Sequence, residues 1–231
     1  VMWNGYGSVA QIDVVDGGIL ASTGTTGTPG SPALLASACD PDLPFGANGA
    51  IVGSSCDFVS SWGFRVTGTG ALALSGAEIR GGNLTNLASD TVIDVADSAF
   101  VDSLVQLVDG DLSLRDSTWL RSPLTITSDT APAVTGNTWT DTDIPASLTL
   151  VVDPSGVHDN TATGADPKHH LMLFNQVTVD HDWTPDPTTD SGLVLGNLGV
   201  TVAGATLTMP AGSVMWNGYG SVAQIDVVDG G

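Results

Sequence analysis

The stretch IDVADSAFVDSLVQLVDGDLSLRDSTW, residues 93–119, contains one short pattern twice. Ile93–Phe100 reads apolar-x-apolar-x, then a turn of small or acidic residues, one further residue and a large apolar side chain. Leu112–Trp119 repeats this order 19 residues later (112 − 93). Alternation places every second side chain on one face of a β-strand, and small or acidic residues favour a turn. The stretch therefore predicts a strand and a corner that recur at a fixed spacing.

The same pattern occurs along most of the chain. It starts at residues 72, 93, 112 and 132, at intervals of 21, 19 and 20 residues, and returns at Val200–Leu207 and Ile12–Ile19. One alternating strand cannot bury its apolar face alone, so a chain that returns about every 20 residues stacks each strand parallel to the last. We therefore predict an all-β fold, a right-handed parallel β-helix with a continuous inner column of apolar side chains.

Two other folds fit the sequence less well. Leucine-rich repeats share the period, but their L-x-x-L-x-L-x-x-N pattern is absent from this sequence. A β-sandwich places strands roughly every 8–12 residues and would not explain the fixed spacing of strand and turn.

The string VMWNGYGSVAQIDVVDGG occurs at Val1–Gly18 and again at Val214–Gly231. The simplest interpretation is an array of 213-residue units (214 − 1), of which this chain holds one unit and the start of the next. An overlap engineered to complete the fold is the alternative. Both interpretations make the two copies equivalent and predict an end-to-end joint. The joint residues are Val1, Trp3, Ile12, Val14, Val214, Trp216, Ile225 and Val227.

Reading from Trp183 through the end of the chain and on into its start reveals a further set of motifs. A strand follows Trp183, then VTVAGATLTMPAG at 200–212, GILASTGT at 18–25 and Pro32. This order resembles bacterial extracellular right-handed parallel β-helix proteins of the pectate-lyase-like class, with one extra residue, Ala211. The resemblance implies a β-helical scaffold that enzymes and adhesins share.

We predict one β-helical unit over residues 1–231, with two protruding loops, 33–60 and 140–182, that interrupt the period. About ten coils per unit would rise ~50 Å. The first loop carries Cys39 and Cys56 on either side of a Pro- and Gly-rich segment. A disulfide between them is the favoured interpretation and implies an oxidising compartment, with two free thiols as the alternative.

The composition narrows the function classes. Acidic residues outnumber basic ones 25 to five, which gives a formal net charge of −20. Such a surface repels nucleic acid and anionic lipid, so neither is an expected partner. No run of about 18 apolar residues predicts a membrane span. A large negative charge keeps a crowded, solvent-exposed polymer soluble, which is consistent with this composition.

No residue is assigned a catalytic, cofactor-binding or metal-binding role. The four histidines fall late in the chain, beside aspartates, at spacings that do not define a metal site. Asp97 and Asp116 hold the same place in successive coils, where bound Ca²⁺, Arg115 or solvent would relieve their repulsion. Trp119 and Trp139 share the last apolar place of the pattern, which favours burial over a sugar-binding stripe.

These features predict an extracellular, cell-surface structural protein whose units stack head to tail into a fibre, stalk or sheath. Its partner is a further copy of itself, joined covalently or as a homopolymer, and the outward loop 33–60 is a candidate for lateral contacts between copies or with a surface. An adhesin that binds glycan or protein is the alternative, and a secreted polysaccharide lyase or hydrolase is the third candidate. The five basic residues form no recognisable acid–base cluster, so we expect no enzymatic activity.

Overall fold

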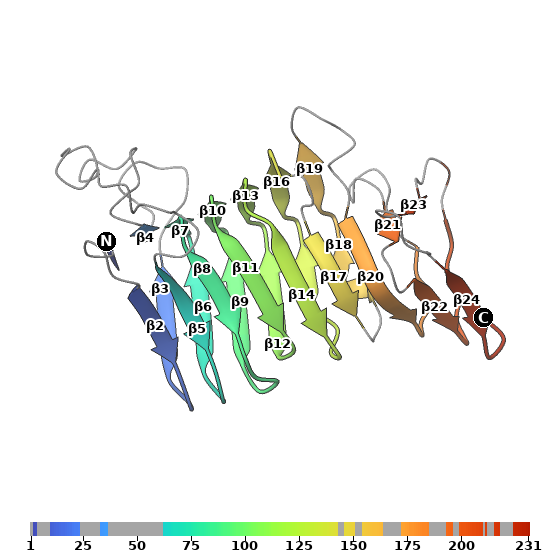
Figure 1. The fold of residues 1–231 in the computed structure, drawn as a ribbon, viewed down its shortest axis with the longest axis horizontal. Helices are drawn as coiled ribbons and strands as arrows, with labels where there is room; N and C mark the ends of the chain where they lie inside the picture. Colours follow the sequence, from blue (N-terminus) through green and yellow to red (C-terminus); the bar gives the residue numbers. More distant parts are fainter. Residues whose placement is uncertain are drawn as a thin grey trace.

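The computed structural model describes residues 2–3, 10–23, 33–36, 62–142, 146–150, 154–163, 172–184, 193–195, 199–209, 211, 215–217 and 224–231. These residues are almost all β-strand, apart from turns and the short 3-10 helix η3 (Pro154–Gly156). Parallel strands stack along the long axis of the molecule as a β-solenoid (Figure 1). The predicted all-β parallel solenoid is confirmed.

Three sheets, called A, B and C here, form the sides of the solenoid. Sheet A has seven strands, in the order β1 (Met2–Trp3), β4 (Ala33–Ala36), β7 (Ala77–Arg80), β10 (Ala99–Val101), β13 (Thr118–Leu120), β16 (Thr138–Thr140) and β19 (Thr161–Thr163). Sheet C has six, in the order β18 (Val157–His158), β15 (Ala133–Thr135), β12 (Asp111–Arg115), β9 (Val92–Ala96), β6 (Ala71–Ser75) and β3 (Ile19–Thr23).

Sheet B has eleven strands. It begins with β2 (Ala10–Val14), β5 (Trp62–Val66), β8 (Asn83–Asn86), β11 (Leu104–Val108), β14 (Leu124–Ser128), β17 (Ala146–Leu150) and β20 (Met172–Val179). Beyond β20 it continues as two rows, β21 (Leu193–Leu195) with β23 (Met215–Asn217), and β22 (Val200–Ala203) with β24 (Ile225–Val228).

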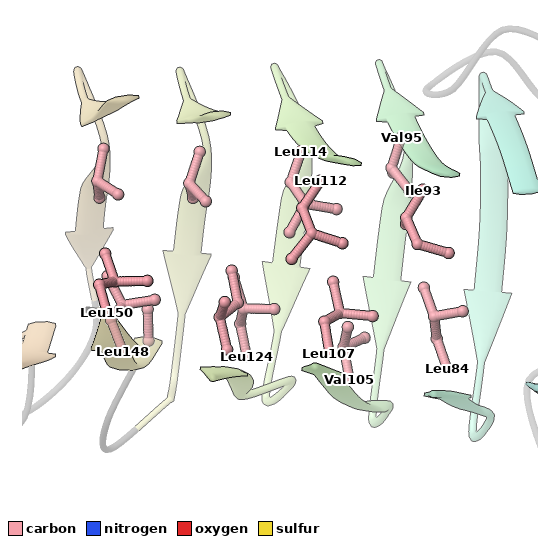
Figure 2. Packing of buried hydrophobic residues seen from close by; sticks show 14 of the residues in the cluster. Leu84, Ile93, Val95, Val105, Leu107, Leu112, Leu114, Leu124, Leu148 and Leu150 are labelled. Carbon is pink, nitrogen blue, oxygen red and sulfur yellow. The ribbon is translucent and has the colours of Figure 1, made fainter. Parts of the chain in front are cut away.

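The repeated sequence pattern is aligned in register between coils. In sheet C, Val95 pairs with Leu114, which pairs with Val134 in the next coil. All three side chains are buried. Figure 2 shows labelled leucine, isoleucine and valine side chains of neighbouring strands in one continuous apolar interior. The alternation read from the sequence is therefore the alternation between core and solvent.

The large apolar residue that ends each pattern lies in sheet A. Phe100, Trp119 and Trp139 stack over one another, with ring centroids 4.2 Å and 5.6 Å apart and interplanar angles of 7° and 20°. The rings are completely or almost completely buried. Burial of the two tryptophans is confirmed, and a sugar-binding stripe made of them is contradicted, because neither ring reaches solvent.

The corners of the solenoid depend on left-handed backbone conformations. Between sheets C and A, the residues with positive φ in five successive coils are Gly76, Asp97, Asp116, Gly136 and Asp159. Between sheets A and B they are Gly81, Asp102, Arg121 and Asp141. Glycine and aspartate are suited to this conformation. Glycine has no Cβ to clash, and the short aspartate side chain forms hydrogen bonds with nearby backbone groups. The prediction that Asp97 and Asp116 are stacked is confirmed.

The residue after each of these corner residues is buried and forms a ladder of hydrogen bonds. Ser98 N donates to Ser117 Oγ at 3.1 Å, and Ser117 N donates to Asn137 Oδ1 at 3.2 Å. Asn137 N donates in turn to Asn160 Oδ1 at 3.1 Å. A second ladder at the next corner joins Ser103, Ser122 and Thr142. Each ladder satisfies buried backbone N–H groups that the turn leaves without a strand partner.

The number of coils differs from the prediction. Sheet C has six strands, so the complete three-sided coils number about six, where the constant period predicted about ten. The constant period fails because long connections take up residues: Ile12 pairs with Phe64, 52 positions later (64 − 12). From β2 to β24, sheet B has nine strands in sequence and eight steps, a rise of ~38 Å rather than ~50 Å.

The two predicted loops also differ from what the described residues show. Segment 140–182 includes β17, β18, β19 and β20, which continue the three sheets. The period hid these strands because their partners are spaced further apart, as with Leu148 and Phe174, 26 positions apart (174 − 148). The loop predicted at 33–60 begins with β4, which pairs with β7. Cys39 and Cys56 lie outside the described residues.

Asn137 provides a test of the corner ladder. We expect Asn137→Ala to lower the free energy of unfolding by about 3 kcal/mol, because it removes hydrogen bonds to Ser117 N, Trp119 Nε1 and Leu114 O in the interior. Urea denaturation measures this change. Gln106→Ala on an exposed strand position is the control and should change stability by less than about 0.5 kcal/mol. Equal effects of the two substitutions would contradict the ladder.

Candidate functional site

The two copies of the repeated string lie at opposite ends of the described solenoid. β2 from the first copy is at one end of sheet B, and β24 from the second copy is at the other (Figure 1). Trp3 lies in β1, paired with β4 in sheet A, and Trp216 lies in β23, paired with β21 in sheet B. Val1 and Val214 lie outside the described residues.

The second half of each copy adopts the same backbone conformation. Residues 12–14 and 225–227 are both β-strand and continue into turns of the same form. Asp16 and Asp229 have φ of 33° and 53°, and Gly17 and Gly230 have φ of 79° and 81°. Each copy therefore makes the same corner, although the two lie at opposite ends of the solenoid.

A matching hydrogen bond closes the two turns. Gly18 N donates to Val15 O at 2.7 Å, and Gly231 N donates to Val228 O at 3.0 Å. A tight turn closed by its own backbone bond is set by local sequence, so it forms in the same way in both settings. The equivalence that the sequence predicts therefore holds over residues 12–18 and 225–231. It is wrong for Trp3 and Trp216, which lie in different sheets, because their neighbouring strands differ.

The two copies pair on opposite edges. In the first copy, Ile12 pairs with Phe64 and Val14 pairs with Val66, on the side of the following coil. β2 has no other partner strand among the described residues.

In the second copy, Ile225 pairs with Val200 and Val227 pairs with Val202, on the side of the preceding coil. β22 is likewise the one partner strand of β24 in the part of the chain that the structure describes. The same strand sequence thus pairs with two different neighbours, one on each edge.

Burial differs sharply between the copies. Val14 is 5% exposed, whereas Val227, the same residue of the repeat, is 60% exposed. Ile225 is 44% exposed, whereas its copy Ile12 is partly buried against the core. Val15 and its copy Val228 are exposed in both settings, at 50% and 41%. Val14 is covered because β5 and the coil behind it lie against β2, and the described residues provide no such coil beyond β24. The difference identifies the outer edge of β24 as an incomplete part of the core.

An ion pair between the first copy and the coil that follows it was not predicted from the sequence. Arg65 Nε lies 2.9 Å from Asp13 Oδ1, between register partners in β5 and β2. Asp226, the copy of Asp13, is exposed and accepts a hydrogen bond from Gln224 Nε2. The period gives no signal for this pair, because the two charges are 52 positions apart (65 − 13).

The other candidate residues from the sequence fall on the surface. His158 and His181 are exposed and contact the neighbouring Asp159 and Asp180 at 2.6 and 2.9 Å. His169 and His170 lie outside the described residues. No group of three or more metal-ligating side chains occurs within the described ranges.

Arg115, one of the groups named to relieve the repulsion between Asp97 and Asp116, pairs with Asp94 at 2.8 Å.

Of the described residues, none forms a helix long and apolar enough to cross a membrane. The chain matches no known protein family, no curated protein and no solved structure.

The burial difference predicts an unequal response to one substitution made in each copy. Val14→Ala should lower the free energy of unfolding by about 2 kcal/mol, because it removes buried methyl groups. Val227→Ala should lower it by less than about 0.5 kcal/mol in the single molecule, since the side chain is already exposed. Urea denaturation at a concentration where the chain is monomeric measures both. Equal losses would show that the two ends are buried alike.

Proposed function

We propose that this chain is an extracellular structural repeat protein whose units stack head to tail into a fibre, stalk or sheath. The observation that carries the proposal is the pair of identical strands: one is covered by the following coil, and the other has no strand on that side among the described residues. An exposed parallel strand presents unpaired N–H and C=O groups to a further strand. In the first copy, the strand that pairs with this edge is β5, so β5 of a further unit is suited to cover the edge of β24.

The chemistry of the open edge supports assembly. Val227 and Ile225 are large apolar side chains with 60% and 44% exposure, and their copies Val14 and Ile12 are less exposed beneath the following coil. Such side chains at an uncovered sheet edge favour burial against another chain, at roughly 25 cal/mol for each Å² of apolar surface removed from water. The contact would also be heterologous, meaning between two different surfaces, because the surface that would cover this edge is at the opposite end of the molecule. Contacts of this kind that do not close a ring produce filaments.

The extracellular location is supported by the sequence. The sequence read from Trp183 to the end of the chain and on into its start resembles extracellular β-helix proteins. Cys39 and Cys56 are suited to a disulfide. A net charge of −20 keeps an exposed polymer hydrated and discourages lateral aggregation between filaments. The proposed partner is therefore a second copy of this chain, joined along the solenoid axis.

The proposal predicts filaments with a defined axial repeat. Eight or nine strand spacings per unit correspond to ~38–43 Å. Negative-stain microscopy and fibre diffraction of the concentrated protein should show this repeat together with the ~4.8 Å strand spacing. A protein that stays monomeric at all concentrations, or filaments with an unrelated repeat, would refute the proposed function.

A charge at the open edge should prevent the joint from forming. We expect Val227→Lys to abolish filaments while leaving the melting temperature of the single molecule unchanged, because the side chain is 60% exposed. Val108→Lys is the matched control, since Val108 is 42% exposed in β11 in the middle of the solenoid. Sedimentation velocity should show wild-type assembly for the control. Loss of assembly in both variants would indicate lateral contacts instead of end-to-end ones.

A further inference from the structure

The 231-residue chain contains two segments that fit one position. β2 covers the outer edge of β5, and β24 has the same residues in the same conformation, with its other edge covered by its one partner among the described strands, β22. We propose that two molecules join by strand exchange, in which residues 225–228 of one molecule replace residues 12–15 of the next against β5. This inference rests on the proposed end-to-end assembly and specifies how the joint is made.

The contacts of the exchanged joint can be read from the first copy. Ile225 would pair with Phe64 of the next molecule, and Val227 with its Val66, as Ile12 and Val14 do within the chain. A backbone bond at the corner would be reproduced as well. Thr67 N, which donates to Val14 O at 2.9 Å, would donate to Val227 O of the neighbouring molecule. The exchange therefore needs no contact that the fold does not already contain.

The alternative joint is simple stacking, in which the open edge of β24 pairs with the open edge of β2. Identical strands would then lie in register, with Asp226 of one molecule directly opposite Asp13 of the next. Like charges directly opposite each other destabilise a strand pair, and the net charge of −20 adds to this repulsion. Exchange instead places Asp226 against Arg65, which already pairs with Asp13 at 2.9 Å.

The two joints also differ in length along the axis. Exchange superimposes β24 on the place of β2, so each unit adds eight strand spacings, or ~38 Å. Stacking keeps both strands and adds one spacing, which gives ~43 Å. The axial repeat of the filament therefore distinguishes the joints independently of any substitution.

Reversal of the charge at Asp226 is the test. Asp226→Arg in the full chain should raise the protein concentration needed for assembly roughly tenfold, because exchange would then place the introduced guanidinium directly opposite Arg65. The melting temperature of the monomer should stay that of wild type, since the Asp226 side chain is exposed. Asp94→Arg is the matched control: Asp94 pairs with Arg115 at 2.8 Å in the middle of the solenoid, and its substitution should leave assembly unchanged.

A second variant restores the pair across the joint. Arg65→Asp combined with Asp226→Arg places a carboxylate opposite Asp13 within each molecule. In the exchanged joint, that carboxylate instead faces the guanidinium introduced at position 226 of the neighbouring molecule. We expect assembly at or below the wild-type concentration, with a ~38 Å repeat by fibre diffraction.

The outcomes separate the two proposals. Wild-type filaments with a ~43 Å repeat, or an Asp226→Arg variant that assembles as well as or better than wild type, would overturn strand exchange and leave end-to-end assembly standing. Absence of wild-type filaments at any concentration would overturn both. The single variant decides the question even where the double variant fails to fold.

Discussion

Hydrogen bonding between stacked parallel strands is the interaction on which the rest of this structure depends. A parallel strand leaves half of its backbone groups for the next coil, so no coil is complete by itself. Gly110 at the end of one coil shows how close the coils are: its ideal Cβ would lie 2.7 Å from Thr91 O of the coil below. The corners, the ladders of buried polar side chains and the open ends all follow from this requirement, because each coil must present its edge to the next.

The corners explain the unusual composition of the chain. A turn that recurs in every coil needs a residue that accepts positive φ, and at most of these places the chain uses glycine or aspartate. Much of the acidity is therefore structural in origin. Arginines offset part of it: Arg121 forms two hydrogen bonds to Asp102, at 2.6 and 2.7 Å, one coil below. These pairs are about half exposed and contribute little to stability, so their main effect is on which surfaces can approach each other.

Sequence alone could predict the fold where the period is constant. Between residues 71 and 142 the alternation, the corner residues and the buried tryptophans all follow from spacing, because each coil repeats one local solution. The prediction from a constant period failed where the connections between strands are longer. The strands β17 to β20 and the number of coils were therefore missed. The pairing of Arg65 with Asp13 was missed for the same reason. The shared conformation of residues 12–18 and 225–231 was predictable from the identity of the two copies. Their different burial was not, because burial depends on the neighbouring coil.

The use of the same strand at both ends has a consequence for assembly. A joint between two different surfaces needs each to be complementary to the other, and any change in one must be matched in the other. Here the edge of β5 already recognises the sequence of β24, since that sequence covers it within the same chain. In the proposed strand exchange, recognition between molecules would be the same as recognition within the fold, and the joint would be as specific as the fold itself. A stack of coils advances along its axis and does not close on itself, so a joint of this kind would not limit the length of the proposed filament.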